Sequence, residues 1–133
     1  MIPAQQSSAS DIRTKVRNVF FILLGSAVLA FKQQYTGPLR QIVHAYAGNL
    51  SVSFAVYFLC VNLPIQTKIK RPYAALLALL SVESFEAFNG FGVMANTYDP
   101  IDFIVNAIGV AFASALDTVL ARISATQVRT KSM

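Results

Sequence analysis

Charged residues are scarce in this chain. Only 13% of its 133 residues are Asp, Glu, Lys or Arg, and 55% are hydrophobic, whereas an ordinary soluble domain has about 25% charged residues. One domain of this composition is typical of a membrane protein. The net charge of +5 does not by itself indicate nucleic acid, because Lys and Arg are expected in the cytoplasmic loops of membrane proteins. We therefore predict membrane lipid, and not nucleic acid, as a partner.

Residues that form disulfides, metal sites and catalytic centres are nearly absent. Cys60 is the one cysteine, so an intrachain disulfide is excluded, and a single His beside a single Cys argues against a transition-metal site. We interpret Cys60, which lies in an apolar run, as a small core or lipid-facing residue. The sequence has no P-loop, GxGxxG, HExxH or CxxC motif. We predict no metal, no cofactor and no catalytic residue, which weighs against an enzyme without deciding the question.

Long apolar runs, in contrast, are plentiful. They predict an all-α fold, a four-helix transmembrane bundle in a single domain over residues 1–133. The expected spans are residues 16–33, 39–63, 73–94 and 100–122. The first one resembles a signal peptide, but we interpret it as a membrane helix whose Arg17 reaches the interface by snorkelling. The residues up to Asp11 are polar and expected to be mobile, and those after Ile123 are polar and basic.

The basic residues predict the orientation of the bundle. Nine of the eleven Lys and Arg residues lie in the N-terminal flank, the loop over residues 64–72 and the C-terminal flank, and two lie in the other connections. The positive-inside rule then places both termini in the cytoplasm. With this orientation, the second and fourth spans begin in the outer half of the bilayer, and the third ends there.

Acidic residues are few, but four of the six, namely Glu83, Glu86, Asp99 and Asp102, lie close to one polar turn. They belong to two stripes at helical spacing. The first consists of Glu83, Glu86, Asn89 and Gly90, and the second of Asp99, Asp102, Asn106, Gly109, Ala113 and, as an optional extension, Asp117. A short loop joins the two helices, so we expect the stripes to face each other. The predicted ligand- or partner-binding residues are Arg40, His44, Glu83, Glu86, Asn89, Asp99, Asp102 and Asn106.

Two interpretations of these polar residues stay open. Polar side chains between membrane helices often serve only as interhelical hydrogen bonds, worth about 0.6 to 2 kcal/mol each. Alternatively, carboxylates beside His44 relay protons, or bind a cation or an amine headgroup. Arg40 fits either a carboxylate or a lipid headgroup as its partner. Glu83 is the deepest carboxylate, and the sequence assigns it no role.

The same residues form a recognisable pattern. Glu86-Ala-Phe-Asn89 closes one expected span, Asp99-Pro-Ile-Asp102-Phe-Ile-Val-Asn106-Ala-Ile-Gly109 opens the next, and Arg40-Gln-Ile-Val-His44 opens an earlier one. This arrangement resembles the VanZ-like family of small bacterial membrane proteins. That family has E-x-x-Q, then D-x-x-D-x-x-x-N-x-x-G, with a basic residue and a His upstream. The chain departs from the pattern in having Asn89 for Gln and in lacking the family's loop Arg.

The resemblance implies a multi-pass protein of the bacterial inner (cytoplasmic) membrane, with its polar residues facing the cell envelope. The family is named for resistance to the glycopeptide antibiotic teicoplanin. Because the polar residues converge at one depth in the outer half of the bilayer, we predict that they bind an envelope-side ligand or partner. Two other functions remain compatible with the sequence. One is a small accessory subunit of a larger membrane protein complex, and the other is an enzyme that acts on a lipid-linked substrate.

Overall fold

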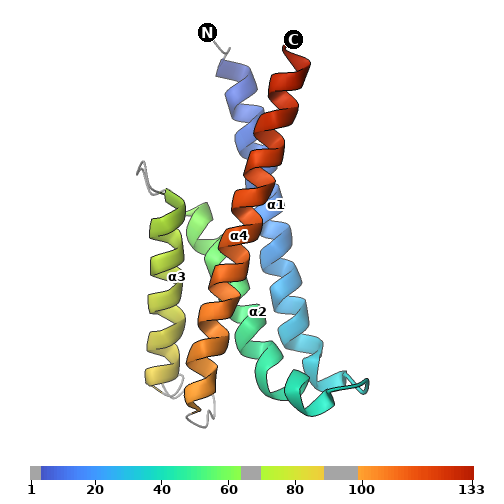
Figure 1. Ribbon diagram of the computed structural model, residues 1–133, viewed down its shortest axis with the longest axis vertical. Coiled ribbons are helices and arrows are strands. Elements are labelled where there is room, and N and C mark those ends of the chain that lie inside the picture. Colours follow the sequence, from blue (N-terminus) through green and yellow to red (C-terminus); the bar gives the residue numbers. More distant parts are fainter. Residues whose placement is uncertain (1–3, 64–69, 89–98) are drawn as a thin grey trace.

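The computed structural model describes residues 4–63, 70–88 and 99–133. In these residues it has four α-helices and no strand, which confirms the predicted fold class. The helices are α1 (Ala4–Phe31), α2 (Arg40–Asn62), α3 (Lys70–Ala87) and α4 (Pro100–Lys131), and the short 3₁₀-helix η1 (Lys32–Gln34) follows α1. Successive helices run in opposite directions, and the two termini lie at the same end (Figure 1).

Local sequence explains where two of the helices end or begin. The last residue of α2 is followed by Leu63, which is extended because a residue before a proline, here Pro64, disfavours the helical conformation. α4 begins at Pro100, a residue suited to the first turn of a helix. Its N-cap is Asp99, whose side chain accepts a hydrogen bond from the backbone N of Ile101 at 2.9 Å.

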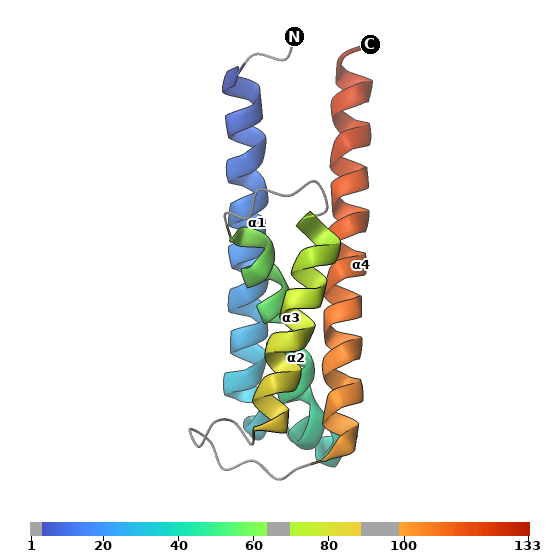
Figure 2. The ribbon, with the colours of Figure 1, turned by 90° about the vertical axis from the view of Figure 1, so that its left-hand side faces the viewer.

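The outer helices are longer than the expected spans. The polar N-terminal residues that we expected to be mobile are helical from Ala4 onward, and α4 continues past residue 122 to Lys131. A helix satisfies its own backbone hydrogen bonds, so it can extend into water beyond its apolar part. Both extensions project past α2 and α3 at the end that carries the termini (Figures 1 and 2). α3 ends at Ala87, and the rest of the third expected span, residues 89–94, lies outside the described residues.

α2 is the centre of the packing. Among the described helices it contacts α1, α3 and α4, whereas the backbone of α1 contacts only α2 and η1. Two glycines permit the closest approaches. A Cβ on Gly25 of α1 would stand 2.7 Å from the backbone oxygen of Ser51, and a Cβ on Gly109 of α4 would stand 2.8 Å from that of Leu50. Small residues at helix crossings allow membrane helices to pack tightly.

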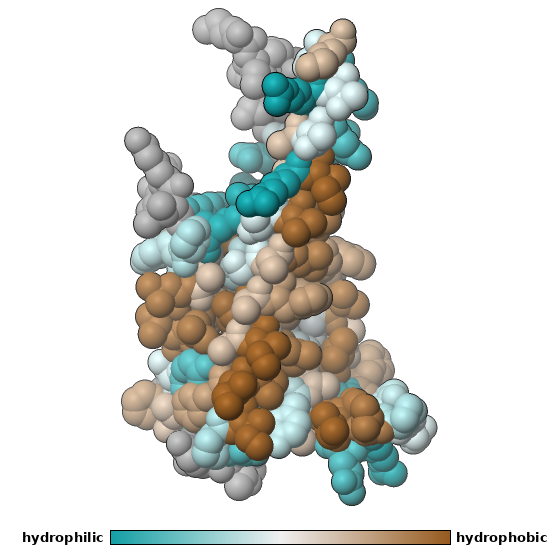
Figure 3. All heavy atoms as spheres, viewed as in Figure 1, coloured by the Kyte–Doolittle hydropathy of each residue, from teal (hydrophilic) through white to brown (hydrophobic). Residues whose placement is uncertain are grey.

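The outward faces of the helices are apolar. Phe20, Leu23, Ile104 and Phe112 are each about 60% exposed, and hydrophobic side chains form a broad band between more hydrophilic ends (Figure 3). Within the part of the chain that the structure describes, three helical segments are long and apolar enough to cross a membrane: Ala9–Gln34, α2 and α4. An exposed apolar surface of this extent is expected to face lipid. α3, which lies against α2 and α4, has four charged residues among its 18.

Candidate functional site

Polar side chains between the helices gather in two groups, one toward each end of the bundle. The group nearer the termini, which we call the Asp117 cluster, consists of Arg17, Asn18, Tyr57, Asn62, Arg71 and Asp117. The group toward the opposite end, which we call the Asp102 cluster, consists of Tyr46, Asn49, Ser53, Asp99, Asp102 and Asn106. The two groups differ in how completely their polar atoms are paired.

Asp117 is fully buried, and its carboxylate accepts hydrogen bonds from three other helices. Arg17 of α1 donates from Nη2 to Oδ1 at 2.6 Å. Tyr57 of α2 donates its hydroxyl to Oδ2 at 2.9 Å, and Arg71 of α3 donates from Nε to Oδ2 at 3.0 Å. A carboxylate with 0% exposure tolerates an apolar environment only when it is paired and hydrogen-bonded. One side chain of α4 therefore connects all four helices.

The Asp117 cluster continues along α1. Arg17 donates to Oδ1 of Asn18 from Nη2 at 2.8 Å and from Nε at 3.1 Å. Asn18, which is 1% exposed, in turn donates to Oδ1 of Asn62 at the end of α2 at 2.9 Å. Both oxygens of the carboxylate are thus hydrogen-bonded and paired with cations, which is the arrangement expected of a structural contact. The second guanidinium, that of Arg71, leaves the cluster with one net positive charge.

Sequence reasoning did not assemble the Asp117 cluster. It placed Asp117 at the optional end of a stripe, Arg17 at the interface and Arg71 in a basic loop. A usable signal was present, because a carboxylate inside an apolar helix requires a partner and the expected topology puts both arginines at its depth. Tyr57 gives no such signal, since aromatic residues are common in apolar helices.

The Asp102 cluster joins α4 to α2. Ser53 donates to Oδ1 of Asn106 at 2.8 Å, the Tyr46 hydroxyl lies 3.5 Å from Oδ2 of Asp99, and the Asn49 side chain hydrogen-bonds Asp102. These contacts correct the expectation that the α4 stripe faces α3. α2 and α4 run in the same direction and approach closely at Gly109, so this stripe is turned toward α2.

Glu83 and Glu86 of α3 lie at the same depth as the Asp102 cluster. α3 and α4 run in opposite directions and are joined by the Arg71–Asp117 contact. Both helices rise about 1.5 Å per residue, so the step from 71 to 86 matches the step from 117 to 102. Glu86 is therefore level with Asp102, and Glu83 is within one residue of the level of Asn106. Glu86 and Asp102 are 5% and 7% exposed.

Two buried polar atoms at this depth have no partner among the described residues. One is Oε2 of Glu83, and the other is Nδ2 of Asn106, a residue that is 2% exposed. Buried polar atoms in native proteins are nearly always hydrogen-bonded, so each exception calls for an explanation. We call the Asp102 cluster together with Glu83 and Glu86 the Asp102 level. It contains buried polar atoms without a described partner, whereas both oxygens of the Asp117 carboxylate are hydrogen-bonded.

Two further predicted site residues, His44 and Arg40, lie at this end of the bundle without a described contact to the carboxylates. Nε2 of His44 lies 3.0 Å from the backbone oxygen of Tyr35. Arg40 is exposed at the start of α2, and none of the described hydrogen bonds or ion pairs involves its side chain. Asn89 lies outside the described residues. Sequence reasoning thus identified Asp99, Asp102 and Asn106 as neighbours but not their partners on α2.

The Asp102 level is rich in acceptors. Among the described residues this level has four carboxylates, those of Glu83, Glu86, Asp99 and Asp102, and the cation whose charge acts on Asp102 is Lys32. The Nζ of Lys32 donates to the backbone oxygen of His44 at 3.2 Å. No group of three His, Cys, Asp or Glu residues that could hold a metal ion occurs in the described part of the chain. Such a site favours a ligand that brings positive charge and hydrogen-bond donors.

Comparison with known proteins assigns the chain to no family. No family model matches it, and no curated protein or solved structure is significantly similar to it. The residues of the two clusters are therefore the basis on which its function is inferred.

Proposed function

We propose that the chain is a VanZ-like, multi-pass protein of the bacterial cytoplasmic membrane with both termini in the cytoplasm. In this proposal the Asp102 cluster, together with Glu83 and Glu86, binds a positively charged ligand, such as a protonated amine, or a partner on the envelope side. The charge distribution supports this orientation, because the end with the termini is basic and the opposite end is acidic. The described basic residues at the terminal end are Arg13, Lys15, Arg17, Lys70, Arg71, Arg122, Arg129 and Lys131.

One observation carries the proposal: among the described residues, buried polar atoms on the neighbouring helices α3 and α4 lack partners at the depth where carboxylates are concentrated. If these side chains served only as interhelical hydrogen bonds, Oε2 of Glu83 and Nδ2 of Asn106 would each be expected to have a partner. Neither atom has one among the described residues. A ligand with an ammonium group donates to the carboxylates, and an adjacent hydroxyl or carbonyl oxygen accepts from Asn106. The ligand thereby supplies the partners that these two atoms lack.

The proposal is tested by changing Glu86 and Asp102 together to Gln and Asn. These amides keep the size of the side chains but remove two negative charges, so ligand binding is expected to be abolished. The family resemblance supplies a readout, namely the concentration of teicoplanin that inhibits bacteria expressing the chain. We expect the double variant to reach the membrane at the wild-type level and to give the susceptibility of cells with an empty vector. The matched control is Asp11→Asn, which removes a carboxylate at the opposite, basic end. Wild-type resistance in the double variant would contradict the proposed role of the site.

A second candidate function is that of a small accessory subunit in a larger membrane complex. The observation that favours it is the packing of α1, whose backbone contacts only α2 and η1 among the described elements. Residues such as Phe20 and Leu23 remain exposed along α1 and are available to another transmembrane helix. If gently solubilised membranes yield the chain alone and at its monomeric mass, this alternative fails.

A further inference from the structure

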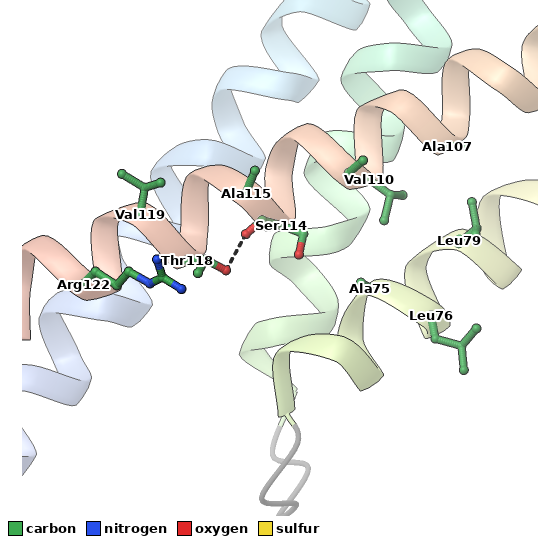
Figure 4. A pocket seen from close by; sticks show the side chains of 11 residues that line it. Ala75, Leu76, Leu79, Ala107, Val110, Ser114, Ala115, Thr118, Val119 and Arg122 are labelled. Atoms are coloured by element: carbon green, nitrogen blue, oxygen red, sulfur yellow. Dashed lines mark hydrogen bonds between the residues drawn. The ribbon is translucent and has the colours of Figure 1, made fainter.

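A groove of about 650 Å³ runs between α3 and α4 on the outside of the bundle. Its walls are apolar and largely made of small side chains: Ala75 and Leu79 come from α3, and Ala107, Ala111 and Ala115 come from α4 (Figure 4). From Ala107 to Arg122 the groove follows α4 for about 22 Å, at 1.5 Å per residue. One leaflet of the hydrocarbon core is about 15 Å thick, so the groove is long enough to take an extended lipid chain.

The end of this groove nearer the termini carries unpaired positive charge. Arg122 lines the groove there, with its guanidinium extended toward Thr118 (Figure 4). Arg71, at the start of α3, uses only Nε on Asp117, and its side chain is 45% exposed. None of the described hydrogen bonds or ion pairs uses the Nη atoms of Arg71 or the guanidinium of Arg122. Hydrophilic side chains gather over this part of α3 and α4, next to the hydrophobic band (Figure 3).

The charge at this end favours an anionic occupant over a second copy of the chain. Arg71 lies one helical turn before Ala75, outside the groove lining, and Arg122 lies five residues beyond Asp117, the partner of Arg71, which is a rise of about 7 Å along α4. Guanidinium groups bind phosphate through paired hydrogen bonds. A second copy packed in the same direction would bring two basic ends together, and it offers few acidic residues at that end.

We propose that the α3–α4 groove binds an acyl chain of an anionic glycerophospholipid whose phosphate is held by Arg122 and Arg71. In the proposed orientation this lipid belongs to the cytoplasmic leaflet. The preference for an anionic headgroup and an acyl chain would be the same in the opposite orientation. The groove supplies the apolar contact and the two arginines supply the selectivity for the anionic headgroup. The groove is separate from the Asp102 cluster, so an experiment can refute lipid binding in the groove without refuting ligand binding at the cluster, and the reverse.

Native mass spectrometry tests the proposal on the full chain released from nanodiscs with equal amounts of phosphatidylglycerol and phosphatidylcholine. We expect the wild type to retain phosphatidylglycerol preferentially. Arg122→Gln is expected to lower that retention about fivefold, as one cationic contact near a membrane surface contributes about 1 kcal/mol. Ala111→Phe fills the groove from an exposed position, so it is expected to remove bound lipid without disturbing the core.

Matched control variants distinguish lipid bound in the groove from general electrostatic attraction between anionic lipid and the basic end of the chain. Arg129→Gln removes the same charge and Ala125→Phe adds the same bulk on α4, both outside the groove lining, and we expect both to retain lipid like the wild type. Equal retention of the two lipids by the wild type, or equal loss in Arg122→Gln and Arg129→Gln, would overturn the proposal. A concentration-dependent dimer that Ala111→Phe abolishes while lipid retention is unchanged would assign the groove to a second copy and overturn it as well.

Discussion

Replacing Asp117 with leucine is expected to destabilise the fold by about 3 kcal/mol, within the range for breaking a buried ion pair. The substitution removes the carboxylate that accepts the Tyr57 hydrogen bond and leaves the guanidinium of Arg17 without a counter-charge, and the Arg17 side chain is only 22% exposed. A loss of this size lowers the unfolding midpoint of a chain this long by on the order of 10 °C. Thermal unfolding in detergent, followed by the monomer peak in size-exclusion chromatography, measures it.

The comparison that isolates the ion pair is a double variant. Arg17→Leu combined with Asp117→Leu replaces both charges of the more buried pair by apolar side chains, which is often close to neutral. Arg71, which also pairs with Asp117, has a side chain that is 45% exposed and can reach water. The double variant is therefore expected to be more stable than Asp117→Leu alone. Asp11→Leu, at an exposed position of α1, is expected to leave the midpoint unchanged. If Asp117→Leu unfolds at the wild-type temperature, Asp117 does not hold the four helices together.

Enlarging Gly25 or Gly109 is expected to have the second-largest effect. A Cβ at Gly25 would lie 2.7 Å from the Ser51 carbonyl oxygen, and one at Gly109 would lie 2.8 Å from that of Leu50. Because these contacts are with backbone, the helices themselves must separate. Gly25→Leu and Gly109→Leu are each expected to cost about 3 kcal/mol, at the upper end of the usual range for overpacking.

The same thermal assay measures both glycine variants. Ala27→Leu adds a comparable side chain to an exposed position of α1, and it is expected to match the wild type. Gly109→Leu also separates Ser53 from Asn106, so it is expected to reduce ligand binding along with stability. Wild-type stability in both glycine variants would show that α2 does not approach α1 and α4 as closely as described.

The helices of this fold are largely predictable from sequence, because each is marked by an apolar run and bounded by charge, proline or glycine. Their extensions were not predictable from hydropathy, since the residues that follow Ala4 and those that precede Lys131 are mostly polar and form no apolar pattern. Charge counts gave an expected orientation, and both termini do lie at one end of the bundle.

The candidate site was predictable within a helix but not between helices. Helical spacing placed Asp99, Asp102 and Asn106 on one face, and they do lie together. Which helix that face meets depends on the close α2–α4 approach at Gly109, which involves residues far apart in the sequence. The hydrogen bond between Ser53 and Asn106 depends on that packing, and the helical spacing of polar residues within one helix does not predict it. The partners of Asp117 were missed because they come from three different helices.

The proposed site requires that the acidic end of the bundle face outward, and labelling of single cysteines measures this directly. Cys60 is first replaced by serine, and a cysteine is then placed either at Thr36, in the α1–α2 connection, or at Ser132, next to the C-terminus. A membrane-impermeant maleimide applied to intact cells is expected to label position 36 but not position 132, which is labelled only after the membrane is opened. Labelling of position 132 and protection of position 36 in intact cells would place the Asp102 cluster toward the cytoplasm and contradict the proposal.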